Sequence, residues 1–188
     1  MQTRPRPTLY GKAVLLRPLG PEDAEAMFAS LADVETMRLT GTQASYTLEQ
    51  VQAHCASLET QEDRVDLAIV EPTSGAYLGE VVLNEIDLHN RSAHFRIALA
   101  RSDLMGKGYG RDAARTMLAW AFDFLKLHRV QLEVFAFNER AIHVYETLGF
   151  QREGMLRETL LQDGVWHDAI VMSLLGGELL RAERPGPR

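Results

Sequence analysis

Three closely spaced glycines, Gly106, Gly108 and Gly110, lie between a stretch with strand-like alternation and a long stretch with helical periodicity. Glycine lets the backbone approach a ligand closely, and the free N–H groups of a helix start attract an anion. The local sequence is Met105, Gly106, Lys107, Gly108, Tyr109, Gly110 and Arg111. It predicts either a loop that binds a phosphate or pyrophosphate, or a plain glycine-rich turn.

Two familiar nucleotide-binding motifs do not account for this loop. A Walker A loop requires G-x-x-x-x-G-K-S/T, and the sequence contains no such run. A dinucleotide fingerprint requires G-x-G-x-x-G, but the residue three positions after Gly108 is Arg111. We therefore expect neither an ATP-type P-loop nor a Rossmann-type site here.

A second group of residues, further along the chain, has the pattern of a short helix with defined ends. Asn138 is a good N-cap residue, and Gly149 suits the position just after a helix. Tyr145 comes four residues after Ala141 and three before Leu148, so these side chains share one face. Taken alone, this face predicts ordinary packing of a tyrosine against the core.

Together the two groups resemble the GCN5-related N-acetyltransferase (GNAT) superfamily. Its first motif, Q/R-x-x-G-x-G/A, is similar to residues 105–110, with Met105 where the family prefers Gln or Arg. Its second motif, N-x-x-A-x-x-x-Y-x-x-x-G-F, matches at Asn138, Ala141, Tyr145, Gly149 and Phe150. The stretches that look like the RimJ/RimL branch of ribosomal-protein N-acetyltransferases are Gly79–Val81, Asn90–Ala93 and the hairpin with Asp163-Gly164. The resemblance covers residues 10–175, and polyamine and aminoglycoside acetyltransferases share much of this layout.

The resemblance implies acetyl-CoA as co-substrate and places its parts along the chain. Gly106 to Arg111 would cradle the pyrophosphate, and Leu99 and Ala100 would pair with the pantetheine amides and polarise the thioester carbonyl. Asn138 would bond the pantetheine arm, cap its own helix, or do both. Tyr145 would point its hydroxyl at the CoA sulfur and protonate the departing thiolate. Met105 changes only a side chain, so we expect the backbone N–H groups to keep their grip on the phosphates.

An ammonium acceptor must lose a proton before its nitrogen attacks the thioester, so a base should lie within reach. The candidates are His94, Glu80 and Asp87. His94 falls where many relatives carry Glu, on the strand before the glycine loop, and imidazole is a common base near neutral pH. Glu80 lies on the neighbouring strand and would act through a water, so the sequence leaves the choice open.

The histidines and Cys55 show no metal-ligand spacing, and Cys55 has the position of a small core residue.

The elements that must position these residues follow the order β-α-α-β-β-β-α-β-α-β-β. Strands are expected over 12–19, 65–71, 76–87, 92–100, 129–137, 150–161 and 165–175, and helices over 21–31, from 47, over 108–127 and over 138–148. This order predicts an α/β fold of mixed α+β type, and the resemblance makes it GNAT-like, with a mostly antiparallel sheet of about seven strands and about four helices. We expect one domain over residues 10–176 and terminal extensions at 1–9 and 177–188, of which the tail at 181–188 should fray.

Charge and composition exclude several classes of protein. The 188 residues include 20 basic and 26 acidic side chains, and residues 11–180 have a net charge of −10. An acidic body argues against a nucleic-acid groove and is compatible with a cationic substrate, although ordinary solubility charge explains it as well. The longest unbroken apolar run, Met117 to Phe122, is too short to cross a membrane, so we expect no membrane partner. A single cysteine and the absence of an apolar leader favour the cytoplasm.

We therefore expect an acetyl-CoA-dependent N-acetyltransferase that acts on a primary amine directly, since no cysteine sits where an acyl-enzyme would form. The branch resemblance points first to a protein N-terminal α-amine and then to a small amine such as a polyamine or aminoglycoside. The alternative is a non-catalytic acyl-CoA-binding sensor or partner protein. The intact motif at Tyr145 counts against a sensor, whereas Met105 and the unassigned base keep it open. A homodimer is compatible with the resemblance.

Overall fold

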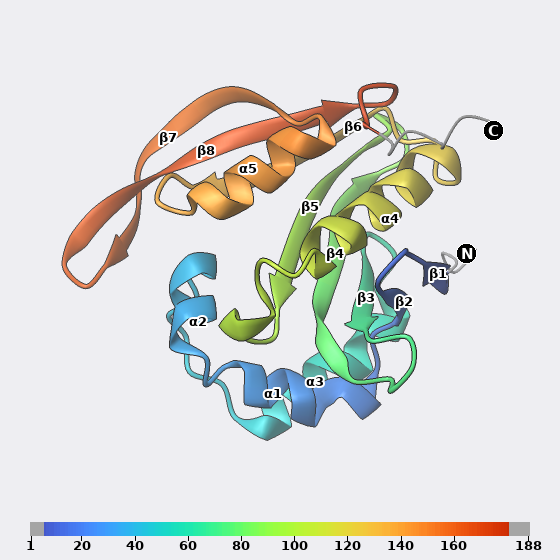
Figure 1. The fold of residues 1–188 in the computed structure, drawn as a ribbon, viewed down its shortest axis with the longest axis vertical. Coiled ribbons are helices and arrows are strands. Elements are labelled where there is room, and N and C mark those ends of the chain that lie inside the picture. Colours follow the sequence, from blue (N-terminus) through green and yellow to red (C-terminus); the bar gives the residue numbers. More distant parts are fainter. Residues whose placement is uncertain (1–5, 181–188) are drawn as a thin grey trace.

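The computed structural model describes residues 6–180, whose strands form one eight-stranded sheet in the order β1-β2-β3-β4-β5-β6-β8-β7. The strands are β1 (Leu9–Tyr10), β2 (Leu15–Pro18), β3 (Val65–Val70), β4 (Tyr77–Asp87), β5 (Ser92–Leu99), β6 (Arg129–Phe135), β7 (Gln151–Gln162) and β8 (Val165–Leu175). The α-helices are α1 (Ala24–Ser30), α2 (Val34–Thr40), α3 (Leu48–Ser57), α4 (Tyr109–Asp123) and α5 (Glu139–Leu148). Short 3-10 turns occur at Pro21–Asp23, Leu58–Thr60 and Ser102–Leu104. Figure 1 shows how the helices are arranged around the sheet.

The core has two layers, one on each face of the sheet. Leu67 and Ile69 of β3 join the large layer that α4 and α5 cover, whereas Ala68 and Val70 join a smaller layer with Met27 of α1. Successive residues of a strand point to opposite faces, so β3 is buried on both sides.

The structure confirms the mixed, mostly antiparallel sheet and adds two elements that the sequence pattern did not predict. Leu9–Tyr10 forms the short edge strand β1, and α2 fills a region for which no element was expected. α2 lacks an apolar stripe, since Val34 is 81% exposed. Its ends are nevertheless well marked, because Asp33 caps its start and Gly41 ends it in the left-handed region, with φ +66°.

The sheet opens between its two parallel neighbours, β5 and β6. Their paired residues are Ser92 and Arg129, Ala93 and Val130, and His94 and Gln131. Beyond His94, β5 continues to Leu99 beside β4, and β6 continues to Phe135 beside β8. The facing edges of β5 and β6 thus have no ladder hydrogen bonds to each other there. An extended ligand could satisfy such backbone groups by adding to the edge of β5.

Several expected boundaries differ from those of the structure. The long helix ends at Asp123 rather than at 127, and the strand after it ends at Phe135 rather than at 137. At the C-terminal side, packing continues past residue 176, because Leu179 is buried and the Leu180 N–H donates to the Leu148 carbonyl. Residues 1–5 and 181–188, including the tail expected to fray, lie outside the described residues.

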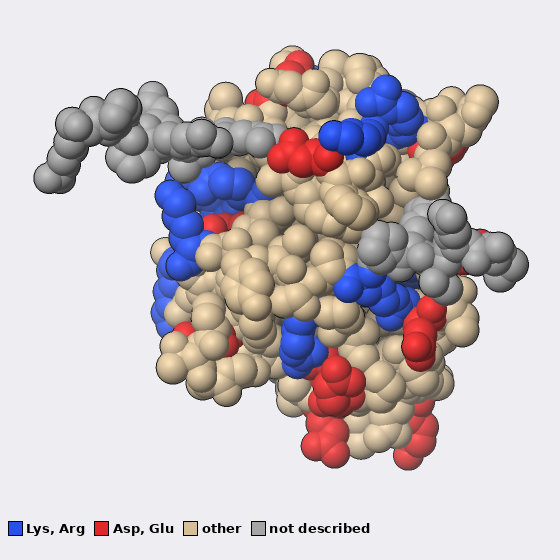
Figure 2. All heavy atoms as spheres, turned by 90° about the vertical axis from the view of Figure 1, so that its right-hand side faces the viewer, with Lys and Arg blue, Asp and Glu red and all other residues tan. Residues whose placement is uncertain are grey.

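The surface carries both charges and one apolar projection. Figure 2 shows Lys and Arg side chains beside Asp and Glu side chains over the same face. The hairpin of β7 and β8 bears exposed apolar side chains, namely Met155, Leu156, Leu161, Val165 and Trp166. Within residues 6–180, no helix is long and apolar enough to cross a membrane.

Candidate functional site

The glycine loop between β5 and α4 is open to solvent and carries free donors. Gly106 and Gly108 have φ angles of +77° and +87°, and a Cβ built on either would meet nothing within 4 Å. Other residues disfavour such angles, so glycine sets the shape of the backbone here. Gly108 begins α4 without a side-chain cap, and no described residue accepts a hydrogen bond from the N–H groups of 106–111. These donors, the helix dipole and the exposed Lys107 and Arg111 fit a phosphate-bearing ligand.

Two contacts hold this loop in place. Asp112, in the first turn of α4, is buried, and its Oδ2 accepts a hydrogen bond from Ala13 N–H at 2.7 Å. Met105 donates its N–H to the Ser102 carbonyl at 3.1 Å, which closes the turn that precedes the glycines. The presence of Met105 in place of the Gln or Arg of the first motif thus leaves the backbone of the loop intact.

The end of β5 leads directly into the loop. The Leu99 side chain lies 3.8 Å from the position that a Cβ on Gly110 would take, so the strand end and the helix start are in contact. The Ala100 N–H donates to the Leu78 carbonyl at 2.8 Å. Of the pantetheine contacts expected at Leu99 and Ala100, the Ala100 N–H is therefore already engaged inside the sheet.

Tyr145 of α5 lies beside the opening between β5 and β6. Its ring packs edge to face on Phe95, the first residue of β5 beyond the pairing with β6, with centroids 6.4 Å apart. Its second ring contact is with Phe150, at 5.6 Å. Burial raises the pKa of the Tyr145 hydroxyl to about 12, and no residue between 6 and 180 forms a hydrogen bond with it. The hydroxyl is therefore a protonated donor at neutral pH, as a general acid must be.

Asn138 caps α5 as expected, and its other amide atom reaches α2. Oδ1 accepts from the Ala141 N–H at 3.1 Å, and Nδ2 donates to the Leu39 carbonyl at 3.4 Å. The Arg38 guanidinium lies over the Phe137 ring, 5.2 Å from its centroid. A cavity of about 170 Å³ lies at this junction of α2 and α5. A contact between Asn138 and pantetheine would require Nδ2 to leave Leu39.

His94 is held by its neighbours at the last paired position of β5 and β6. Its Nε2 lies 2.5 Å from Gln131 Nε2 and 3.6 Å from Glu85 Oε2. Arg129 donates to Gln131 Oε1 from Nε at 3.3 Å and from Nη2 at 3.2 Å, which turns the amide nitrogen of Gln131 toward the imidazole. Arg129 in turn donates from Nη1 to Glu153 at 2.8 Å. Because an amide nitrogen only donates, His94 Nε2 is the acceptor in this network.

Glu80 is a buried carboxylate on the same face of the sheet as His94. It is 9% exposed and lies opposite Ala98 across β4 and β5. Its Oε1 accepts from Arg96 Nη2 at 3.3 Å, and its Oε2 has no hydrogen-bond partner among the described residues. Burial raises the pKa of the Glu80 carboxyl, and Arg96 opposes this change. A carboxyl of this kind is suited to receive a proton or to bind a cation.

Asp87, the third candidate base, forms a turn instead. Its Oδ1 accepts from the N–H groups of His89 and Asn90 at 2.8 and 2.9 Å, and its Oδ2 accepts from Asn90 Nδ2 at 2.6 Å. These bonds lower the pKa of Asp87 and close the connection between β4 and β5. The base is therefore to be sought at His94 or Glu80.

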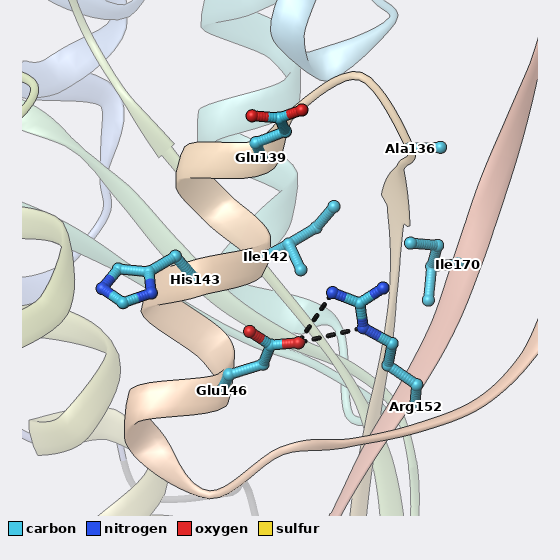
Figure 3. Close-up of a pocket in the computed structure, with 7 residues that line it drawn as sticks. All are labelled: Ala136, Glu139, Ile142, His143, Glu146, Arg152 and Ile170. Carbon is cyan, nitrogen blue, oxygen red and sulfur yellow. Dashed lines mark hydrogen bonds and ion pairs between the residues drawn. The ribbon is translucent and has the colours of Figure 1, made fainter.

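A larger cavity, of about 400 Å³, lies beside α5 (Figure 3). Its lining residues are Ala136, Glu139, Ile142, His143, Glu146, Arg152 and Ile170. Glu146 Oε1 accepts from Arg152 Nε at 2.9 Å and from Nη2 at 2.7 Å, as the dashed lines show. Because neither Tyr145 nor the glycine loop lines this cavity, it is separate from the site. In the described part of the chain, no group of three or more His, Cys, Asp or Glu could hold a metal ion.

Asp33 links α2 to the glycine loop, a role that was not predicted from the sequence. Its Oδ1 caps α2 by accepting from Thr36 N–H at 2.8 Å, and its Oδ2 accepts from Ser102 N–H and Oγ, both at 3.0 Å. Ser102 lies just before Met105, so this bond connects α2 to the arm of the site that carries the glycines. The available signal was an N-cap Asp with Gly41 at the helix end, but seven residues without an apolar stripe concealed it.

A comparison with protein families supports this arrangement. A family model described as "Acetyltransferase (GNAT) domain" matches residues 13–151. The matched range includes the glycine loop, β5, β6 and α5, and it ends one residue after Phe150, the last residue of the second motif. The site described above therefore lies inside the matched region.

Individual relatives agree with the family match. The spermidine N(1)-acetyltransferase of Vibrio cholerae is 36% identical over 112 residues, which are 60% of this chain and 64% of that enzyme. YdaF of Bacillus subtilis, whose name proposes a ribosomal N-acetyltransferase, is 35% identical over 104 residues, which are 55% of this chain and 56% of that protein. The matches thus span less than two thirds of either relative. The crystal structure of the Vibrio cholerae spermidine N-acetyltransferase in complex with CoA and spermine has a TM-score of 0.82 and 25% identity, covering 90% of this chain and 99% of that chain.

Proposed function

Because this chain belongs to the acetyltransferase (GNAT) family, we propose that it transfers the acetyl group of acetyl-CoA to a primary amine. The observation that carries the proposal is the open glycine loop beside the separation of β5 and β6. The free N–H groups of 106–111 suit a pyrophosphate, and the unpaired edge of β5 suits the amides of pantetheine. Acetyl-CoA supplies the acetyl group already activated as a thioester.

Tyr145 is the proposed general acid. Its hydroxyl is protonated at neutral pH and has no partner in the described chain, while Phe95 holds its ring beside the opening. From this position the hydroxyl donates its proton to the sulfur as the thiolate leaves. An ordinary thiol, with a pKa of about 8.5, is already a fair leaving group, so this assistance is modest in size.

Transfer is proposed to be direct, with both substrates bound together. The only cysteine, Cys55, is 2% exposed in the layer beneath α1 and α3, and burial raises its pKa to about 11. An acyl-enzyme on cysteine requires an accessible thiolate, which this environment disfavours. The amine must therefore attack the thioester itself.

The acceptor we propose first is a polyamine, with a protein N-terminal α-amine second. This order reverses the expectation from the sequence alone, because similarity to a spermidine acetyltransferase is found both in the sequence and in the solved structure. The similarity to YdaF and to the RimJ/RimL branch is the reason for keeping the N-terminal amine as the second candidate acceptor. Both acceptors are primary amines that carry a positive charge near neutral pH.

A turnover screen tests the function and separates it from the sensor alternative. Acetyl-CoA is incubated with spermidine, an aminoglycoside or a peptide with a free N-terminus, and both free CoA and acetylated amine are measured. We expect equal amounts of the two products with at least one amine. A protein that binds acetyl-CoA but releases no CoA with any acceptor would be a sensor, and release of CoA without acetylated amine would be hydrolysis.

A further inference from the structure

We propose that Glu80, rather than His94, receives the ammonium group of the acceptor and takes its proton. This inference rests on the proposed acetyl transfer and assigns the base that the sequence left open. It also names the acceptor class, which is an aliphatic amine that arrives as a cation.

Glu80 has the only carboxylate oxygen of the described chain that is both buried and without a hydrogen-bond partner. The residue is 9% exposed, and its other oxygen has one long contact, to Arg96 at 3.3 Å. A buried polar atom that lacks a partner costs free energy, and a ligand that donates to it recovers that cost. An ammonium group has three donors and a charge opposite to that of the carboxylate, so it fits this oxygen well.

The position of Glu80 relative to the opening follows from the strand register. Glu80 lies opposite Ala98, in the stretch of β5 that has no partner on β6. Residues opposite each other on antiparallel strands have Cα atoms about 4.5 to 5.5 Å apart. The side chain that lies between Glu80 and the opening is therefore the methyl group of Ala98. The Glu80 carboxylate, or one water bound to it, can reach past this methyl group.

His94 lies on the same face, but its nitrogen is already engaged. Gln131 donates to His94 Nε2, and Arg129 fixes Gln131 by donating twice to its Oε1. A proton on Nε2 would require the Gln131 amide to turn over. Its NH₂ would then face the Arg129 guanidinium, and both hydrogen bonds from Arg129 would be lost. The network therefore holds His94 as an acceptor that is already satisfied.

Arg96 shows what kind of group the Glu80 carboxylate accepts. Its side chain is 60% exposed, and it contacts Glu80 through one nitrogen only. This exposed guanidinium can move into solvent if another cation takes its place, because the buried carboxylate itself needs a partner. An alkylammonium that enters along the sheet face can take this place without leaving a buried charge unpaired.

The proposed step balances as follows in protons and bonds. The acceptor R–NH₃⁺ gives one proton to the Glu80 carboxylate, and the freed electron pair forms the C–N bond to the thioester carbon. The C–S bond breaks, and the thiolate takes the proton of the Tyr145 hydroxyl. Tyr145 regains a proton from the nitrogen, and Glu80 later releases its own to solvent. The products are the amide, CoA with a free thiol, and one proton.

The surroundings of Glu80 determine how the step depends on pH. The groups that face it are Arg96 on β5, Arg64 and Asp66 at β3, Tyr77 on β4 and Cys55 on α3. Burial raises the pKa of Glu80 above its usual value, and among these groups only the arginines oppose that change. kcat/KM should therefore rise with pH as Glu80 ionises. A lysine-type amine has a pKa of about 10.4, so the ionisation of the acceptor changes kcat/KM in a separate, higher pH range.

The kinetic test compares Glu80→Gln with His94→Gln, using Glu59→Gln as a control that removes an exposed carboxylate from the turn at Leu58–Thr60. With spermidine and an N-terminal peptide as acceptors, Glu80→Gln should lower kcat/KM by on the order of 10²-fold or more and abolish the rise with pH. His94→Gln should keep that rise, and Glu59→Gln should behave as the wild type. A rise that persists in Glu80→Gln but disappears in His94→Gln would overturn the assignment.

A binding measurement without acetyl-CoA tests the inference independently of turnover. Titration calorimetry with spermidine should show at least tenfold weaker binding to Glu80→Gln than to the wild type. The melting temperature should not fall, because the substitution removes a buried charge that lacks a full set of partners. Unchanged spermidine affinity in Glu80→Gln would refute the inference. So would a wild type that binds neither spermidine nor the N-terminal peptide. If the wild type turns over while Glu80→Gln matches it, the acetyl transfer stands and only the base is wrong.

Discussion

The rings of Tyr145 and Phe95 meet edge to face, with their planes at 89° and their centroids 6.4 Å apart. Tyr145 belongs to α5, which follows β6, whereas Phe95 belongs to β5. The contact therefore links β5 to the helix that follows β6, just beyond the point where the pairing of these two strands ends. It fixes the position of the Tyr145 ring along the opening between β5 and β6, and hence the place where its hydroxyl can reach a leaving group.

Tyr145→Phe removes only the hydroxyl and keeps this ring contact. We expect kcat to fall by on the order of 10²-fold, at the low end of general-acid contributions, because a thiol leaves readily. The loss should appear equally in kcat/KM, as for an interaction made mainly in the transition state, while acetyl-CoA affinity stays unchanged. Steady-state kinetics and an acetyl-CoA titration measure both quantities.

Tyr145→Ala provides the contrast, since it also removes the ring from Phe95 and Phe150. It should lower the free energy of unfolding by about 3 to 5 kcal/mol, the usual cost of losing a buried aromatic ring. A Phe variant with wild-type kcat, under conditions where chemistry limits turnover, would reduce Tyr145 to a packing residue.

Gly108→Val should abolish acetyl-CoA binding. A branched Cβ would stand in the space above the loop, and valine strongly disfavours the φ of +87°. Gly75→Val is the matched control, because Gly75 has a φ of +71° and equally open surroundings but lies in the turn between β3 and β4. Calorimetry with acetyl-CoA should separate the two variants. Equal affinities in both would remove the glycine loop from the site.

Cys55→Ala should leave kcat and the kinetic pattern unchanged. The Cys55 thiol is buried and its pKa is raised to about 11 by desolvation, so it neither reacts nor carries an acetyl group. Initial rates with both substrates varied should give intersecting lines for the wild type and the variant. Parallel lines, or labelling of the folded protein by iodoacetamide in competition with acetyl-CoA, would contradict direct transfer.

Local signals were enough to predict two helix starts and one tight turn. A helix was expected to start at residue 47, and the side chains of Thr47 and Gln50 form a capping box there; Asn138 caps α5 as expected. Asp163 and Gly164 adopt φ angles of +51° and +79°, which suit the tight hairpin predicted for them. Each of these features depends on residues that are neighbours in the chain, so a pattern of residue types is sufficient to find it.

The chemistry of the site depends on contacts that no local pattern contains. His94 has the position of a base, but Gln131, 37 residues later, occupies its nitrogen. Asp33 reaches Ser102 across 69 residues. β5 and β6 separate after three paired positions, and the sequence of neither strand marks where the pairing stops. The residue types were therefore predictable, and their partners were not.

The bond between Asp33 and Ser102 should make the anchoring of α2 depend on pH. Hydrogen bonds from Ser102 and Thr36 lower the pKa of Asp33 from 3.8 to about 2. A carboxyl whose folded pKa is lowered contributes stability that is present above its unfolded pKa. This contribution should therefore be complete above about pH 5 and decline as the pH falls from about 4 to 2.

Asp33→Asn isolates this effect, because the amide keeps an oxygen to cap α2 but offers only donors toward Ser102. Asp33→Ala loses the cap as well and should cost about 1 kcal/mol in the free energy of unfolding. Glu35→Gln is the control on the same helix, since Glu35 pairs with Arg38 and not with Ser102. Urea unfolding at pH 7 and pH 3 should show a difference between wild type and Asp33→Asn that shrinks at the lower pH. A difference that is constant across this range would mean that the charge of Asp33 does not hold α2 to the glycine-loop arm.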